Sequence, residues 1–223
     1  MPPAIHHLSV SRTARYLTLG QLTDDTREIW LVLHGYGQLA TEFLSHFTEL
    51  DDGSRFFIAP EGLSRFYARG LEGRPVASWM TSEDREAEIK DYINYLDDLY
   101  THLRLHWYHA RLVLLGFSQG VATATRWLAE SNRTADVVVA CSGSIAEEHR
   151  QPLPDKFRKG PMWVYITAAS DPLITPEQHR QARELMGELK AHVLDFEGGH
   201  ELRSDMLVKA AQLIRERTGK KRG

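Results

Sequence analysis

Hydrophobic positions recur with two different spacings along the chain, and these spacings predict strands and helices in alternation. We expect short β-rich runs near residues 6–10, 14–19, 29–34, 55–59, 111–116, 136–141, 162–168 and 192–196. We expect helices near residues 39–50, 84–106, 119–131, 176–190 and 201–218. The later β-rich runs are almost continuously apolar, which is typical of parallel strands covered on both faces.

Alternation of strand and helix predicts βαβ units and a three-layer α/β fold with a mostly parallel sheet. The first two runs have no helix between them, so we expect them to pair as an antiparallel hairpin at the N-terminal edge of the sheet. Residues 60–80 follow neither spacing and are expected to form a long functional loop. The length of 223 residues fits a single domain over residues 1–223 with no large cap domain, and residues 218–223 are expected to be a frayed basic tail.

Composition narrows the possible roles of the protein. The formal net charge is −3 and the charges of both signs are interleaved, so we expect no nucleic-acid partner. No apolar run approaches the ~20 residues of a membrane-spanning helix, and the N-terminus lacks the pattern of a secretory signal. A single cysteine, Cys141, cannot form an internal disulfide, so we expect a reducing, cytoplasmic location without membrane insertion.

Residues 116–120 read Gly-Phe-Ser-Gln-Gly and lie between an apolar run and an amphipathic helical pattern. A G-x-S-x-G element in a strand–turn–helix context is typical of the nucleophile elbow of α/β-hydrolases. Gly116 and Gly120 carry no Cβ that would clash in the sharp turn. We therefore predict that Ser118 is a nucleophile, and the alternative is that it only caps the following helix.

A serine hydroxyl becomes a good nucleophile when a neighbouring base takes its proton. In the α/β-hydrolase order the acid and then the base follow the serine along the chain. Asp171 lies in a turn just past a strand, and His200 follows the last strand through a double glycine, at the sheet edge where ligands bind. We predict Ser118, Asp171 and His200 as the catalytic residues. Asp195 is a rival acid, disfavoured because it lies within a strand, and Asp171 could instead simply form a turn.

A tetrahedral oxyanion formed at Ser118 would need fixed backbone N–H donors. One expected donor is Gln119, directly after the serine, and the other is Tyr36, in the His-Gly-Tyr-Gly loop after an apolar run. His34 opens this loop, and we interpret it as a buried hydrogen-bonding support more readily than as a proton carrier.

Six motifs occur here in an order that we recognise: HGYG, APEG, SWM followed by an acidic helix, GFSQG, SDP and GGHE. Over roughly residues 28–218 the chain resembles the phospholipase/carboxylesterase family of α/β-hydrolases, which includes the acyl-protein thioesterases. The resemblance implies a cofactor-free serine hydrolase that acts on carboxylic esters or thioesters. It also implies that Ser118, Asp171 and His200 form the triad.

The chain departs from that family pattern at three positions. Gln38 stands where an acidic residue often follows HGxG, Val121 replaces a common glycine after GFSQG, and Ala168 replaces a small turn glycine before the acid. These departures alter the surroundings of the acyl pocket and leave each catalytic group in place.

The 60–80 segment offers apolar and aromatic side chains suited to a substrate pocket, although plain core packing is an equal alternative: Leu63, Phe66, Tyr67, Trp79 and Met80. Its arginines could bind an anionic head group or be solvated loop charges: Arg65, Arg69 and Arg74. The absence of a cap domain favours a shallow pocket and short to medium acyl chains. We expect a small-molecule ester or thioester as the substrate and allow for a homodimer.

We therefore predict a serine carboxylesterase that works through an acyl-enzyme. Acyl thioesterase or lysophospholipase activity would use the same triad and differ only in the leaving group. A non-catalytic binding protein on this fold, or a peptidase, is disfavoured. We expect no metal, since His102 and His106 form only a surface pair without a third ligand.

Overall fold

The computed structural model describes residues 3–104 and 110–219 of the chain. Its strands are β1 (Tyr16–Leu19), β2 (Glu28–Leu33), β3 (Arg55–Pro60), β4 (Ser64–Leu71), β5 (Pro75–Ser78), β6 (Arg111–Phe117), β7 (Val137–Cys141), β8 (Met162–Ala168) and β9 (His192–Phe196). Its helices are α1 (Ala40–Ser45), α2 (Arg85–Arg104), α3 (Gln119–Glu130), α4 (Asp155–Lys159), α5 (Pro176–Glu188) and α6 (Ser204–Gly219), with the 3₁₀ turns η1 (Thr48–Leu50) and η2 (Glu147–His149).

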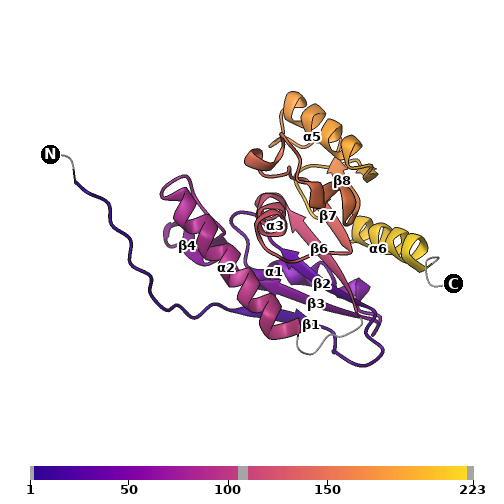
Figure 1. The fold of residues 1–223 in the computed structure, drawn as a ribbon, viewed down its shortest axis with the longest axis horizontal. Coiled ribbons are helices and arrows are strands. Elements are labelled where there is room, and N and C mark those ends of the chain that lie inside the picture. Colours follow the sequence, from indigo (N-terminus) through magenta and orange to yellow (C-terminus); the bar gives the residue numbers. More distant parts are fainter. Residues whose placement is uncertain (1–2, 105–109, 220–223) are drawn as a thin grey trace.

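Seven of the described strands form one sheet in the order β1-β3-β2-β6-β7-β8-β9 (Figure 1). Strand β1 runs antiparallel to β3, and the other neighbouring pairs are parallel. The carboxyl ends of β2, β6, β7, β8 and β9 therefore meet at one edge of the sheet. Loops that follow these strands are the expected place for a binding site in an open α/β sheet.

The central strands bury both of their faces, as their continuous apolar runs predicted. Along β2, Ile29, Leu31 and Leu33 pack toward α2, α3 and α5, whereas Trp30 and Val32 pack toward α1 and α6. Successive side chains of a strand point to opposite faces, so an uninterrupted apolar run requires a cover on each side. The three-layer α/β architecture expected from the sequence is confirmed.

The N-terminal edge differs from the expected hairpin. Strand β1 is antiparallel, as expected, but its partner is β3, with Tyr16 opposite Pro60 and Leu19 opposite Phe57. Residues 6–10 form no strand, and the N-terminal segment runs away from the body as an extended chain (Figure 1). The intervening Ser-Arg-Thr at 11–13 lacks the Gly or Asn that a tight hairpin turn favours, which explains why the two runs do not pair.

Residues 60–80 do not form the irregular loop that we expected. Strands β4 and β5 pair antiparallel as a separate two-stranded sheet, with Ser64 opposite Ser78 and Tyr67 opposite Pro75. Many of its residues are exposed, so the segment lacks the apolar alternation by which a half-buried strand is recognised.

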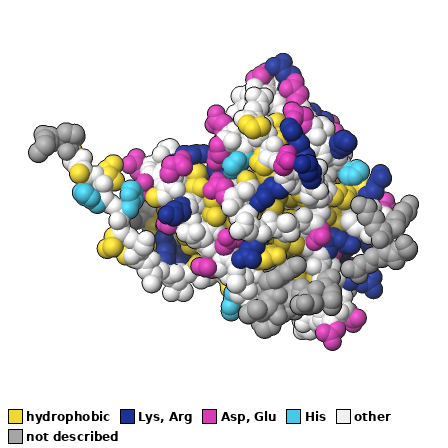
Figure 2. Space-filling view, viewed as in Figure 1, with side chains coloured by type: hydrophobic (Ala, Val, Ile, Leu, Met, Phe, Trp, Pro, Cys, Tyr) yellow, Lys and Arg dark blue, Asp and Glu magenta, His cyan; other side chains and the backbone are white. Residues whose placement is uncertain are grey.

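Other differences concern the ends of elements and the surface. Helix α6 begins at Ser204 and continues to Gly219, so residues 218–219 of the expected tail are helical, and 220–223 lie outside the described residues. Among the described helices, none combines the length and apolar character needed to cross a bilayer. On the face shown in Figure 2, acidic and basic side chains are interspersed over the surface.

Candidate active site

The G-x-S-x-G segment forms a sharp turn between β6 and α3, with Ser118 at its apex. Ser118 has φ 53° and ψ −118°, a left-handed backbone conformation that is strained for a residue with a side chain. A Cβ on Gly116 would lie 2.4 Å from the Gly120 carbonyl oxygen, and one on Gly120 would lie 2.1 Å from the Leu33 carbonyl oxygen. The two glycines are therefore required by the close approach of backbone around Ser118.

Three of the predicted residues meet at the carboxyl edge of the sheet. Nε2 of His200 lies 2.8 Å from Ser118 Oγ, and Nδ1 of His200 lies 2.6 Å from Asp171 Oδ2. The Leu173 N–H donates to the other carboxylate oxygen, Oδ1, at 2.9 Å, which fixes the orientation of the acid. Because an ionised Asp171 can only accept, Nδ1 of a neutral His200 carries the proton and Nε2 is free to accept one from the serine.

The Asp171 side chain is 1% exposed and that of His200 is 17% exposed. The acid is thus shielded from water, while the imidazole remains accessible beside the serine. The ring of Phe117 packs against the His200 ring with centroids 5.1 Å apart. The rival acid Asp195 instead forms an ion pair with Arg183 on α5.

The loop after β2 holds the second group of predicted residues. The Gly35 N–H donates to Gln38 Oε1 at 2.8 Å, and the Gly37 N–H donates to the Ala77 carbonyl at 2.9 Å. Within the described part of the chain, the backbone N–H of Tyr36 has no such partner, and neither has that of Gln119 at the first turn of α3. Tyr36 and Gln119 stay the predicted oxyanion donors.

His34 supports this loop, as we interpreted it from the sequence. It is buried, its Nδ1–H donates to the Gly35 carbonyl at 2.8 Å, and its Nε2 accepts from the Gly62 N–H at 3.0 Å. Burial lowers the pKa of His34, which keeps the ring neutral and in this tautomer. The side chain of Gln119 joins α3 to the segment after β5: its Nε2 donates to the Met80 carbonyl, and its Oε1 accepts from the Trp79 N–H.

None of the five residues predicted to form a substrate pocket lines the cavity beside the serine, and that pocket stays a prediction: Leu63, Phe66, Tyr67, Trp79 and Met80. Trp79 is in the core and donates to the His34 carbonyl, which is the packing alternative stated above. Phe66 contacts the ring of Tyr36, and Tyr67 is 52% exposed. Two of the loop arginines are held by carboxylates, Arg65 by Glu61 and Arg74 by Glu42.

The cavity beside the serine has a volume of about 300 Å³. Ser118 and His200 line it together with residues from α3, from β8, from α5 and from the segments that follow β7 and β8: Ala122, Ser142, Gly143, Ser144, Arg150, Tyr165, Leu173, Ile174, Gln178, Gln181 and Ala182. Sequence reasoning missed these residues. A signal was available for Ser142, Gly143 and Ser144, which lie just past the carboxyl end of the parallel strand β7.

One group of potential metal ligands occurs among the described residues, namely Glu130, Glu148 and His149. Arg126 and Arg85 already bind Glu148, and Nε2 of His149 lies 3.4 Å from Glu130. The two arginines already neutralise Glu148, so we assign no metal to the cluster. Of the predicted surface pair His102 and His106, only His102 is among the described residues.

The parallel sheet, its antiparallel edge and the turn at Ser118 define an α/β-hydrolase fold. Solved structures with this fold include esterase PE8, with 19% identity and a TM-score of 0.65 over 92% of this chain and 99% of that one. Zea mays acyl-protein thioesterase 2 has 15% identity and a TM-score of 0.68 over 92% and 99% of the two chains. A Bacillus cereus carboxylesterase has 17% identity and a TM-score of 0.61 over 91% and 94%.

The sequence matches the phospholipase/carboxylesterase family over residues 21–216. The chain therefore belongs to that family, as its motifs indicated. A search of curated proteins found no match. The solved structures share the fold at low identity, so the substrate must be argued from the site itself.

Proposed function

We propose that this protein is a serine carboxylesterase that hydrolyses carboxylic esters of short to medium acyl chains through an acyl-enzyme. The observation that carries the proposal is the continuous chain of contacts from Asp171 through His200 to Ser118, with distances of 2.6 and 2.8 Å. A nucleophile, a base and an orienting acid at these distances are the parts that nucleophilic acyl transfer requires.

In the first half-reaction, Ser118 Oγ attacks the ester carbonyl carbon while His200 Nε2 takes the hydroxyl proton. The negative charge that develops on the carbonyl oxygen is stabilised by the backbone N–H groups of Tyr36 and Gln119. Loss of one such donor typically raises the barrier by about 2.7–4 kcal/mol. The intermediate collapses when the C–O bond to the alcohol breaks, and the His200 proton passes to the leaving oxygen.

In the second half-reaction a water molecule takes the place of the alcohol. His200 Nε2 accepts a proton from the water as its oxygen attacks the acyl carbon. The same two backbone amides stabilise the new oxyanion. The acid is released when the bond to Ser118 Oγ breaks, and the proton returns from His200 to the serine.

The volume of the cavity supports short acyl chains. About 300 Å³ lies at the lower end of the range for ligand pockets, roughly 300–1,000 Å³. The acyl-protein thioesterase among the structural neighbours shares the fold, and the same triad would cleave a thioester. We therefore propose esters as the main substrates, with thioesters differing only in the leaving group.

Labelling with a fluorophosphonate probe, followed by peptide mapping, tests the proposal. We expect one adduct, on Ser118, and no adduct in Ser118→Ala. The kcat of Ser118→Ala should fall until its rate exceeds the uncatalysed hydrolysis by only roughly 10³–10⁴-fold, which is what binding and the oxyanion hole supply. Ser82→Ala is the matched control, because Ser82 is exposed and is not one of the predicted catalytic residues. This variant should take the probe on Ser118 as the wild type does. A folded protein that gives no adduct on Ser118 would contradict the proposal.

A cytoplasmic location and a homodimer stay predictions. The location fits Cys141, which is buried as a free thiol and so needs no oxidising compartment.

A further inference from the structure

The cavity beside Ser118 contains polar groups that the proposed reaction does not use. Ser142 is 2% exposed and Tyr165 is 0% exposed, and both line the cavity. Within the described residues, Ser142 Oγ has no hydrogen-bond partner, and the Tyr165 hydroxyl has a weak contact with the Thr167 side chain. Leaving a buried polar group unpaired is costly, so the unpaired Ser142 hydroxyl indicates a ligand that pairs with it.

Arg150 adds a positive charge to the same cavity. Its Nε donates to the Ile145 carbonyl at 2.9 Å, and among the described residues no carboxylate lies within ion-pair distance of its guanidinium. Each of the other described arginines that is buried or partly buried does pair with a carboxylate: Arg55, Arg85, Arg111, Arg126, Arg133 and Arg203. Arg150 is therefore a partly buried cation whose counter-charge is missing from the described chain.

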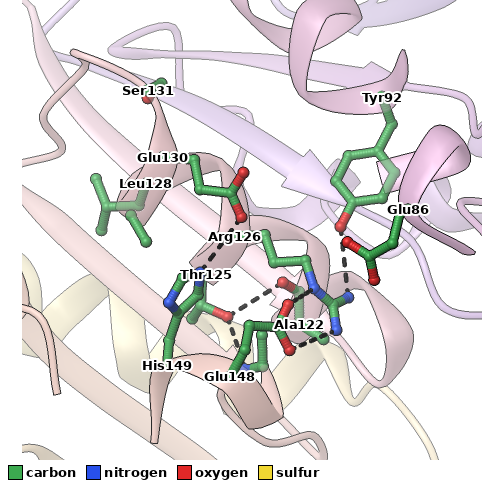
Figure 3. Close-up of polar contacts among 12 residues, drawn as sticks. Glu86, Tyr92, Ala122, Thr125, Arg126, Leu128, Glu130, Ser131, Glu148 and His149 are labelled. Atoms are coloured by element: carbon green, nitrogen blue, oxygen red, sulfur yellow. Dashed lines mark hydrogen bonds and ion pairs between the residues drawn. The ribbon is translucent and has the colours of Figure 1, made fainter. Parts of the chain in front are cut away.

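The segment that carries Arg150 is fixed to helix α3. Figure 3 shows the Arg126 side chain between Glu148 and Tyr92, and the Thr125 hydroxyl beside the same segment. The Ala146 N–H donates to Thr125 Oγ1 at 3.1 Å, and His149 approaches Glu130. These contacts hold η2 at both of its ends, so Arg150 reaches the cavity from a positioned backbone.

No Asp or Glu is among the described residues that line the cavity. Burial raises the pKa of Tyr165, so its hydroxyl stays protonated and can donate. Arg150, Tyr165 and Ser142 thus present a cation and two hydroxyl donors to one space. This combination suits an oxyanion with several acceptor positions, and a guanidinium matches the planar geometry of a carboxylate.

We propose that this cavity binds a free carboxylate on the substrate, so that the preferred ester carries a second, anionic carboxyl group. Arg150 binds this carboxylate, while Tyr165 and Ser142 donate hydrogen bonds to it. The inference rests on the proposed esterase function and specifies its substrate class. In chemical terms the preferred substrates are half-esters of short dicarboxylic acids or acyl esters of short hydroxy acids.

Paired substrates test the proposal. Monoethyl glutarate carries the anion in its acyl part and is compared with ethyl pentanoate; O-acetylglycolate carries it in the alcohol part and is compared with propyl acetate. We expect kcat/KM, followed by proton release, to be higher for the anionic ester in at least one of the two pairs. Arg150→Gln should lower that anionic-to-neutral ratio by roughly 10- to 100-fold, as expected for loss of a charge-assisted hydrogen bond.

Two further variants make the result specific. Tyr165→Phe removes only the hydroxyl and should lower the same ratio by a smaller factor, several-fold. Arg180→Gln is the matched control, because Arg180 is an exposed arginine on α5 that pairs with Glu177 and does not line the cavity. It should leave the ratio unchanged.

A binding measurement separates this proposal from the proposed catalysis. In Ser118→Ala, calorimetric titration with monoethyl glutarate or O-acetylglycolate should show binding that Arg150→Gln weakens by a similar factor. If the wild type turns over both members of each pair equally well, or if Arg150→Gln leaves the ratios unchanged, the carboxylate site is overturned while the esterase function stands. If no ester is turned over and Ser118 takes no fluorophosphonate, it is the esterase function that fails.

Discussion

His200 Nε2 lies 2.8 Å from Ser118 Oγ, although 82 residues separate the two in the sequence. Each partner is positioned independently of the other. The elbow between β6 and α3 fixes the serine, and the carboxylate of Asp171 holds the imidazole through Nδ1. Such preorganisation means that little reorganisation is needed when charge develops in a transition state.

Replacing Asp171 by Asn tests the orienting role of the acid. The amide can favour the wrong imidazole tautomer, so we expect kcat to fall by about 10⁴-fold, as the equivalent change does in serine proteases, while the fold is kept. Turnover of p-nitrophenyl butyrate and thermal melting are the two measurements. Asp195→Asn is the matched control: Asp195 pairs with Arg183, so this variant should keep wild-type kcat. A strong loss in Asp195→Asn with little loss in Asp171→Asn would reverse the assignment of the acid.

Gly120→Ala tests whether the elbow requires glycine. The added Cβ would lie 2.1 Å from the Leu33 carbonyl oxygen, which belongs to the central strand β2 and cannot easily move. We expect the free energy of unfolding to fall by about 2–4 kcal/mol, measured by urea denaturation. Gly187→Ala in α5 provides the contrast, because nothing lies within 4 Å of its added Cβ. It should be neutral or stabilising by roughly 0.5–1 kcal/mol.

Most of the fold follows from local patterns because the central strands are buried on both faces. The apolar run from Ile29 to Leu33 requires a sheet that is packed against helices on both faces. His200 can be identified as the base because it follows the last strand of the sheet. The order of Ser118, Asp171 and His200 along the chain predicts that they lie at the same edge of the sheet. The structure brings these three side chains within hydrogen-bond distance.

The cavity was not predictable in the same way. Arg150 reaches it because Arg126 and Glu148 hold η2 against α3, and contacts of this kind between distant segments leave no periodic pattern in the sequence. Composition makes the aromatic residues of 60–80 candidates for either a pocket lining or the core, and Trp79 is in the core beside the His34 ring. Composition alone does not separate a pocket lining from a core.

The acyl-chain preference follows from the size of the cavity. Across a series of p-nitrophenyl esters we expect kcat/KM to be highest for short acyl chains and to fall before decanoate, since about 300 Å³ cannot enclose a long chain. Filling the cavity with Ala122→Phe should shift the optimum toward acetate, because Ala122 lines it. The control Ala87→Phe changes a residue of α2 that does not line the cavity and should leave the profile in place. Activity that keeps rising beyond decanoate would rule out this cavity as the acyl site.

The ion pair between Arg126 and Glu148 should make stability depend on pH in the acid range. The hydrogen bond from Arg126 lowers the pKa of Glu148 from 4.5 to about 2. A carboxyl whose pKa is lower in the folded state contributes stability above its unfolded pKa and loses it as the pH falls through its folded pKa. Glu148→Gln should therefore be less stable than the wild type at neutral pH, and the difference should shrink as the pH falls from about 4.5 toward 2.

Urea unfolding at a series of pH values measures this difference in the free energy of unfolding, with Glu147→Gln, an exposed neighbour, as the control. If the difference between Glu148→Gln and the wild type stays constant over that range, the ion pair does not stabilise the segment that carries Arg150.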